Sequence, residues 1–283
     1  DTTAGDLFGC AVALSGNIAA IGACGDDDAG PEAGSVYIFV SDGINWMQQA
    51  KLIANDTGMF DHFGASVSID GNSVIVGAHG RDEAGSDSGA AYVFVSDGAR
   101  WTQQAKLTAN DAVTGDLFGF SVSISGDTAS VGAYQNDAAG PDSGAAYIFT
   151  RNGTRWTQQV KLSPKDAGIG DEFGYAVSII ANYVIIGAPK DDHLGIDAGS
   201  AYIFVYNGTN WIQQAKLTAT DAASGDEFGA SVAMSGDYAI VGAWKDDQPV
   251  FDRTDDPADQ IDKGSAYTFL RSGFSWGQKI RVI

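Results

Sequence analysis

The chain has few cysteines, prolines and basic residues, and it has no long apolar run. Its 283 residues include 2 Cys and 6 Pro, and 16 basic residues stand against 36 acidic ones, which gives a net charge of −20. No stretch approaches the ~18 consecutive apolar residues of a membrane-spanning helix, so we expect no membrane insertion. The negative balance disfavours nucleic acid and anionic membrane surfaces as partners, because both would repel the chain. A hydrophobic content of 44% nevertheless excludes wholesale disorder.

The sequence also lacks a leader segment and a helical period. Because the chain starts at Asp1 and no charged and apolar leader follows, we expect a mature or excised form. Instead, one sequence motif recurs five times. A Phe-Gly pair returns every 55 residues, at Phe8-Gly9, Phe63-Gly64, Phe118-Gly119, Phe173-Gly174 and Phe228-Gly229.

Each copy also contains a Gly-Ala pair and, further along the chain, a tryptophan. The Gly-Ala pairs are Gly22-Ala23, Gly77-Ala78, Gly132-Ala133, Gly187-Ala188 and Gly242-Ala243, and the tryptophans are Trp46, Trp101, Trp156, Trp211 and Trp276. The fifth copy is longer, because extra residues separate Asp247 from Gly264. The approximate repeats are 1–55, 56–110, 111–165, 166–220 and 221–283. A fixed period of this length indicates propeller blades or solenoid repeats.

Each copy contains four predicted strands. In the third copy, 118–124 alternates apolar with small or polar residues, and a second strand runs to Ala133 after a Ser-Gly-Asp turn. Residues 143–150 and 156–162 form two more strands around an Asn-Gly turn. We therefore predict an all-β fold: a β-propeller of five blades, each of four antiparallel strands, in a single domain over 1–283. We expect one closed ring whose first and last blades make the weakest contact.

The paired motifs resemble those of FG-GAP repeats, which are known from the propeller of integrin α-subunits. The resemblance covers essentially the whole chain and implies a propeller that recognises partners outside the cell. Integrin-type blades often carry a calcium loop of the form DxDxDGxxD between their first two strands. Here that place holds only "SGN", "DGN", "SGD", "IAN" or "SGD", so the family's calcium sites are not carried over. Family members usually have seven blades, whereas this chain supplies five.

The acidic residues are unevenly distributed over the predicted loops. We call the side that carries the loops between strands two and three and the blade-to-blade links the loop end. The opposite turns hold only Asp42, Asp70, Asp97, Asp127 and Asp237, and all other acidic residues fall at the loop end. The bases counted there are Arg81, Lys165, Lys190, Lys245, Arg253 and Lys263. We therefore predict a strongly acidic loop end.

Two acids recur at a fixed spacing in each loop between strands two and three. The pairs are Asp27/Glu32, Asp82/Asp87, Asp137/Asp142, Asp192/Asp197 and, separated by the insertion, Asp247/Asp262. One interpretation is that these carboxylates cap turns by accepting backbone N–H groups. The other is a calcium site, because calcium takes six to eight oxygen ligands. Calcium is the one cofactor that the sequence suggests, and both interpretations stay open.

Two further features depend on an extracellular location. Cys10 follows a Phe-Gly pair and Cys24 follows the Gly-Ala pair of the same hairpin, so they lie nearly opposite one another and a disulfide between them is plausible. The alternative is two small buried thiols. Asn55, Asn152 and Asn207 begin N-x-S/T sequons and are candidate glycosylation sites.

The function hypotheses come from different classes. The first is a non-enzymatic extracellular recognition or adhesion module, or a structural surface module, whose acidic loop end binds calcium or a basic partner. The second is a carbohydrate-binding propeller lectin, which needs exposed aromatic residues on the loops; the candidates are Phe60, Tyr134, Trp244 and Phe251. The third is a hydrolase that uses the fifth-repeat insertion. Catalysis needs a non-equivalent set of groups at one place, and repeated residues do not supply one.

Overall fold

The computed structural model describes residues 3–246 and 263–282. They form twenty strands and no helix, in five sheets of four antiparallel strands each. The chain divides into two compact units. Unit 1 comprises Asp1–Asn136 and Ala145–Leu162, and unit 2 comprises Asp137–Gly144 and Ser163–Ile283. The all-β fold and the five four-stranded blades predicted from the sequence are confirmed, and the single domain stays a prediction.

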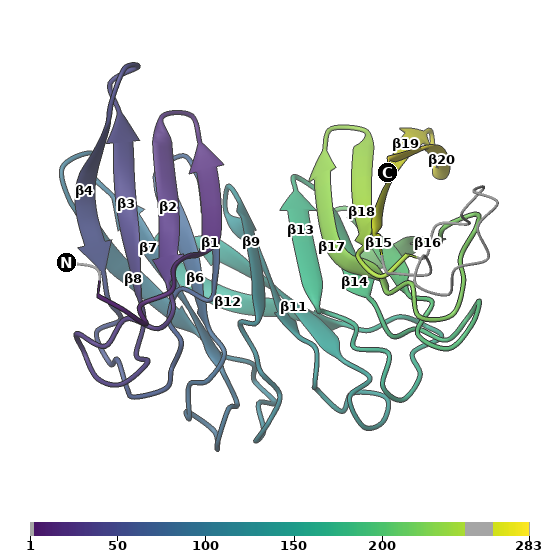
Figure 1. The fold of residues 1–283 in the computed structure, drawn as a ribbon, viewed down its shortest axis with the longest axis horizontal. Coiled ribbons are helices and arrows are strands. Elements are labelled where there is room, and N and C mark those ends of the chain that lie inside the picture. The colour runs from purple at the N-terminus through teal and green to yellow at the C-terminus, as the bar shows by residue number, and fades with distance from the viewer. Residues whose placement is uncertain (1–2, 247–262, 283) are drawn as a thin grey trace, which may run out of the picture. The chain divides into compact units, whose positions relative to one another are not determined.

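Each blade is one sheet whose strands follow chain order (Figure 1). Blade 1 is β1 (Phe8–Ser15), β2 (Ile18–Ala23), β3 (Ser35–Ser41) and β4 (Trp46–Leu52). Blade 2 is β5 (Ser66–Asp70), β6 (Ser73–Ala78), β7 (Ala90–Ser96) and β8 (Trp101–Leu107). Blade 3 is β9 (Ser121–Ser125), β10 (Thr128–Ala133), β11 (Ala145–Asn152) and β12 (Arg155–Leu162). Blade 4 is β13 (Ala176–Ile180), β14 (Tyr183–Ala188), β15 (Ser200–Tyr206) and β16 (Trp211–Leu217). Blade 5 is β17 (Phe228–Ser235), β18 (Tyr238–Ala243), β19 (Ser265–Ser272) and β20 (Ser275–Val282).

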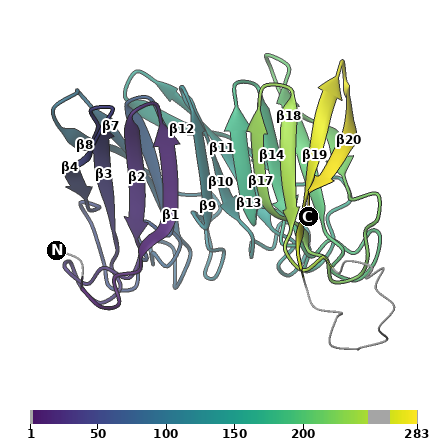
Figure 2. The same ribbon diagram turned by 45° about the horizontal axis from the view of Figure 1, so that its top comes forward.

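The turns between the first two strands of each blade are tight. Ser15 pairs with Ile18 in blade 1, and Asp70 pairs with Ser73 in blade 2, so only two residues make each turn. There is no room in such a turn for the longer integrin-type calcium loop. In blade 1 these hairpin turns and the loop end lie at opposite ends of the strands (Figure 2).

Alternation along the strands gives every sheet two apolar faces. We call the front face the one that carries the phenylalanine of the Phe-Gly pair, and the back face the opposite one. In blade 3, Val122, Val131 and Tyr147 are cross-strand neighbours on the front face. In blade 1, Ala20 and Ile38 are neighbours on the back face. Apolar residues on both faces suit a sheet that lies between two others.

The core lies between consecutive blades, where a back face meets the next front face. Ile75, Ala91 and Val93 from the back of blade 2 form one cluster with Phe118 and Tyr147 from the front of blade 3, all of them fully buried. The back of blade 1 packs in the same way on the front of blade 2. The back of blade 4 packs likewise on the front of blade 5.

The recurring glycines lie where two blades touch. A Cβ atom added to Gly77, in the Gly-Ala pair of blade 2, would lie 1.9 Å from the carbonyl oxygen of Gly119, in the Phe-Gly pair of blade 3. Gly22 and Gly64 meet in the same way between blades 1 and 2, at 2.0 Å. Gly119 also adopts a positive φ of 93°. These glycines therefore allow close approach of two backbones.

Within each unit, a β-bulge in the fourth strand connects one blade to the next. In blade 2, Val93 pairs with Ala105 and Phe94 pairs with Gln103, so Gln104 is the extra residue. Its Oε1 atom accepts a hydrogen bond of 2.9 Å from the indole N–H of Trp156 in blade 3. Gln49 accepts in the same way from Trp101, and Gln214 accepts from Trp276. Bulges re-aim single side chains, and here each one turns a glutamine toward the next blade.

The tryptophans that bond to a preceding blade are Trp101, Trp156 and Trp276, and all three are less exposed than Trp46. Trp156 is buried, with 9% of its surface exposed, whereas Trp46 in blade 1 is 50% exposed. The predicted strand alternation fails at one place. Phe118 lies in the core, but Phe120 packs against His79 and Tyr134 at the loop end, because the chain becomes regular only at β9.

Candidate functional site

The paired acids of the loops between strands two and three cap turns. Their first member accepts a hydrogen bond from the backbone N–H of the second, five residues later. The oxygen–nitrogen distances are 2.7 Å for Asp27/Glu32 and 2.9 Å for Asp82/Asp87, Asp137/Asp142 and Asp192/Asp197. The second members have positive φ angles of 48–54° and exposed side chains. The structure therefore brings four pairs together as turn caps, and Asp247 and Asp262 lie outside the described residues.

A second set of acids is buried in the blade-to-blade links. Asp116 is 2% exposed and accepts the backbone N–H of Val113 at 2.9 Å. Asp61 and Asp171 make the same contact with residues three positions earlier, Gly58 and Gly168. Burial raises the pKa of Asp116 and of Asp171. These carboxylates hold the links in shape.

A network of lysine, tyrosine and aspartate at the loop end was not predicted from the sequence. In blade 4, the ammonium group of Lys216 lies 2.8 Å from Asp166 and 2.9 Å from Asp191. The hydroxyl of Tyr202 donates to Asp191 at 2.6 Å, and Lys216 lies 5.2 Å above the Tyr202 ring. Burial opposes ionisation of Asp191, yet the hydrogen bonds from Tyr202 and Lys216 hold its pKa below the usual value.

The same network recurs in other blades and corrects the predicted charge of the loop end. The last strand of every blade contributes a base that pairs with loop-end acids: Lys51 with Asp26 and Asp28, Lys106 with Asp56 and Glu83, Lys161 with Asp111, and Arg281 with Asp221 and Asp246. These bases lie on strands, so a count of the charged residues in the loops alone leaves them out. The loop end is acidic, but part of its charge is neutralised.

The residues that flank the Phe-Gly and Gly-Ala pairs differ between repeats and lie at the loop end. We call them the variable positions: the residues directly before and after Phe-Gly, and the two that follow Gly-Ala. In unit 1, His62 and His79 occupy two of them with their rings stacked at 5.3 Å, and Phe120 packs on His79. Burial and the neighbouring His62 lower the pKa of His79 to about 4, so the His79 ring is neutral at neutral pH.

In unit 2 the variable positions hold a mixed charged cluster. Glu227 is 5% exposed, and its carboxylate accepts hydrogen bonds from Lys190, from Lys245 at 2.7 Å and from the indole of Trp244. Burial opposes its charge, but these three donors keep the pKa of Glu227 below normal. Trp244 is 59% exposed, with the Lys245 ammonium 4.8 Å from its ring centre. Burial raises the pKa of the nearby Glu172. The repeat period conceals this cluster, because Glu and Lys occupy these positions only in repeats four and five.

Cys10 and Cys24 also occupy variable positions and lie in contact. The backbone N–H of Cys24 lies 3.2 Å from Cys10 Sγ, and both residues are free thiols in the structure. A hydrogen bond from the Cys24 thiol lowers the pKa of Cys10 to about 7. The same contact raises the pKa of Cys24. The structure places the two cysteines together as expected, and their disulfide stays a prediction.

The three sequon asparagines are all exposed. Asn152 ends β11, and Asn207 follows β15, where its side-chain oxygen accepts the N–H groups of Thr209 and Asn210 at 2.9 and 2.8 Å. Asn55 lies in the link after β4. Their glycosylation stays a prediction.

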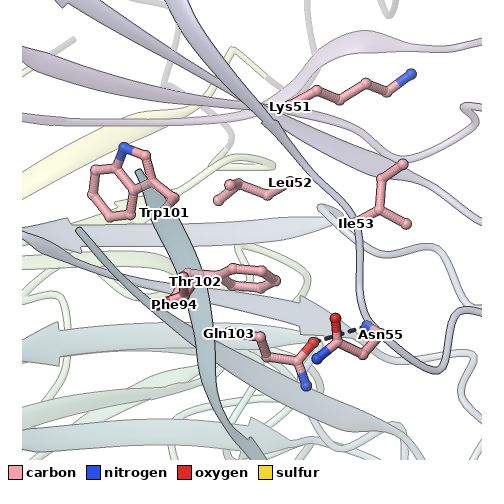
Figure 3. Close-up of a pocket in the computed structure, with 8 residues that line it drawn as sticks. All are labelled: Lys51, Leu52, Ile53, Asn55, Phe94, Trp101, Thr102 and Gln103. Carbon is pink, nitrogen blue, oxygen red and sulfur yellow. Dashed lines mark hydrogen bonds between the residues drawn. The ribbon is translucent and has the colours of Figure 1, made fainter. Parts of the chain in front are cut away.

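Asn55 also lines a groove between the last strands of blades 1 and 2 (Figure 3). The cavity measures about 390 Å³. Gln103 Oε1 accepts the backbone N–H of Asn55 at 2.8 Å. Trp101 contributes an indole ring, and the Lys51 side chain lines the groove while its ammonium group pairs with Asp26 and Asp28. The groove therefore combines hydrogen-bonding groups with one aromatic surface.

Within the described part of the chain, no group of three or more His, Cys, Asp or Glu side chains is arranged to hold a metal ion. Residues 3–246 and 263–282 likewise contain no helix with the length and apolar character needed to cross a bilayer. Calcium binding stays a prediction.

Comparison with known families agrees with the repeat structure. The family described as FG-GAP repeat matches residues 1–39, 46–94, 101–149, 156–204 and 211–269. Each internal match starts at the tryptophan of one blade and ends on the third strand of the next. A comparison with curated proteins finds no match. The matched residues cover most of the sequence, and the chain belongs to the FG-GAP repeat family.

Proposed function

We propose that this protein is a non-enzymatic recognition module of the extracellular space, which binds a partner at its loop end. One observation carries the proposal: the recurring polar residues are used in turns and blade contacts, whereas the variable positions at the same end differ from repeat to repeat. A scaffold of repeats that presents varied loop residues is a common arrangement for binding. The extracellular location rests on the family resemblance alone.

The chemistry of the mixed cluster in unit 2 supports binding over catalysis. Three donors hold Glu227 in its ionised form, and both of its carboxylate oxygens already accept hydrogen bonds. A carboxylate with a lowered pKa and no oxygen left to accept a proton from a substrate is a poor general base. Lys190 pairs with Glu227 and Asp197, so it is a poor nucleophile. The hydrolase hypothesis rests on the insertion in the fifth repeat, which lies outside the described residues.

The loop end favours a partner with basic and apolar groups. The second members of the acid pairs, such as Glu32 and Asp87, are exposed. Apolar side chains lie among the same loops: Phe60 is 54% exposed in unit 1, and Ile169 and Ile196 are each 72% exposed in unit 2. A cationic segment with apolar side chains would match both features.

Binding to an array of cationic amphipathic peptides tests this proposal. The loop-end variant replaces four carboxylates with amides: Glu32→Gln, Asp87→Asn, Asp142→Asn and Asp197→Asn. The control makes the same change at the opposite turns: Asp42→Asn, Asp70→Asn, Asp97→Asn and Asp237→Asn. We expect the loop-end variant to lose binding and the control to keep it. Equal binding by both variants, or no binding by the wild type, would refute a basic partner.

Carbohydrate binding is the second candidate, and the groove of Figure 3 favours it. Its amide and hydroxyl groups suit a hydroxyl-rich ligand, and Trp101 offers an aromatic surface for a sugar ring. Of the loop aromatics expected for a lectin, Phe60 and Trp244 are exposed, Tyr134 is half-buried, and Phe251 lies outside the described residues. A glycan array with the wild type, Trp101→Ala and Trp244→Ala would show whether either aromatic residue binds a sugar.

A further inference from the structure

Phe60 lies in the link between blades 1 and 2, at a backbone position where the other repeats have glycine. Its φ angle is 64°. The residues at the equivalent place in the other repeats are Gly5, Gly115, Gly170 and Gly225, and their φ angles are also positive, from 79° to 106°. A residue with a Cβ atom is strained in this conformation, whereas glycine is not. Four of the five repeats therefore make this turn with a less strained residue.

The contact that the turn requires comes from the backbone of Phe60. Its N–H group donates to the carbonyl of Pro31 at 2.8 Å. In the next link, Gly115 donates in the same way to Ser86 at 2.9 Å. The aromatic side chain stays at the surface, with Phe60 54% exposed, whereas Phe63 is 1% exposed and lies in the core between blades 1 and 2. The turn thus depends on the backbone at this position and not on an aromatic ring.

The Phe60 ring belongs to an exposed apolar pair beside a carboxylate. Met59 is 64% exposed, and a Cβ atom added at Gly30, in the loop of blade 1, would lie 3.2 Å from its Cγ atom. The Glu32 side chain is 54% exposed, with His62 Nδ1 at 3.7 Å from its Oε2 atom. We call Phe60, Met59 and Glu32 the Phe60 patch. Both flanking blades are present in unit 1, so its exposure is not that of a sheet face without a neighbour.

We propose that the Phe60 patch holds an apolar side chain of the cationic partner, next to a basic group that pairs with Glu32. This inference rests on the proposed function, and it adds where the partner binds and which group it must carry. Aromatic residues and methionine are enriched at the centres of protein interfaces, and methionine adapts to apolar partners of different shapes. Strained residues persist at binding sites, where the strain serves function instead of folding.

Phe60→Gly tests the inference, because it removes the ring and supplies the residue that the other repeats have. Phe274→Gly is the matched control, since Phe274 is 89% exposed in the turn between β19 and β20. We expect Phe60→Gly to melt at or above the wild-type temperature, because glycine accepts the positive φ angle. A fall of several degrees would overturn the inference, because it would assign the ring to the fold.

Binding is measured with two sets of synthetic peptides of equal length and lysine spacing, one with leucine and one with serine at the remaining positions. We expect the wild type and the control to bind the leucine set about tenfold more tightly than the serine set. Phe60→Gly should bind both sets as weakly as the wild type binds the serine set.

Two results would overturn the inference and leave a basic partner in place. One is equal binding of the two sets by the wild type, and the other is a Phe60→Gly variant that binds the leucine set as tightly as the wild type does. Failure of the wild type to bind either set would refute the proposed function and this inference together.

Discussion

At the scale of single residues, the glycines of the repeat mark the points where neighbouring blades meet. Gly77 faces the carbonyl of Gly119 so closely that no side chain fits between them. The sequence shows these glycines only as two pairs that recur in each copy. The structure adds which glycine meets which, because that depends on blade stacking.

We predict that Gly77→Ala destabilises the fold by about 3 kcal/mol, as overpacking at a closed contact does. The new Cβ atom would lie 1.9 Å from Gly119 O and 2.2 Å from Ser66 Oγ. Gly277→Ala is the matched control, since a Cβ atom there meets nothing within 4 Å. Urea denaturation of both variants measures the difference. Equal stability of the two would contradict the assigned contact.

The contribution of Asp191 to the ionic network can be tested by measuring the stability of the protein as a function of pH. Its folded pKa lies below the usual value of about 3.9, so its stabilisation is present above about pH 4 and is lost as the pH falls through the folded pKa. Asp191→Asn should therefore cost about 2 kcal/mol at neutral pH and progressively less in acid. The third repeat has Asn136 at the equivalent position, so the backbone accepts the amide. A penalty that stays constant between neutral and acid pH would count against the ionic network.

At the scale of the elements, the positions of the strands follow from the sequence, but the contacts that their side chains make with other elements do not. Alternation around Val122 and the Asn-Gly turn that starts at Asn152 predict the strands of blade 3 within a few residues. The bulge at Gln104 is invisible in the repeat, because a register shift common to every copy leaves the period unchanged. The sequence likewise places Lys216 on a strand, but it does not show that the side chain reaches Asp191 at the loop end.

We predict that Trp156→Ala destabilises the protein by about 3–5 kcal/mol, the usual cost of removing a buried aromatic side chain. It would also remove the hydrogen bond to Gln104. Trp46→Ala is the control and should cost less than about 1 kcal/mol, because half of its surface is exposed. Chemical denaturation measures both. A Trp156→Ala variant that melts like the wild type but loses a ligand would assign Trp156 to binding instead.

At the scale of the whole molecule, a count of loop residues alone overstates the negative charge of the loop end. Strand-borne bases such as Lys106 and Arg281 reach into it. The candidate site was predicted only in part, because the sequence does not show which side chains of the strands reach the loop end. The recurring acids could be placed in loops from sequence, but their use as caps depends on backbone shape at residues such as Glu32.

Calcium binding is tested by melting in calcium chloride and in sodium chloride at matched ionic strength. A bound cation stabilises by about 2.7 kcal/mol at a hundredfold excess over its Kd. If the remaining loop-end carboxylates bind calcium, calcium raises the melting temperature more than sodium does. Screening alone acts equally in both salts, so equal melting temperatures would contradict a calcium site.

The central claim is that recurring residues hold the blades together and that the fold depends less on the side chains at the variable positions. A protease-resistance scan of all single substitutions, with the protein displayed on cells, tests it most directly. The account predicts loss of resistance at Gly77, Gly119 and Trp156, and near-normal resistance at variable positions such as Tyr134 and Trp244. Equal intolerance at the variable positions would contradict the claim, because it would assign those residues to the fold.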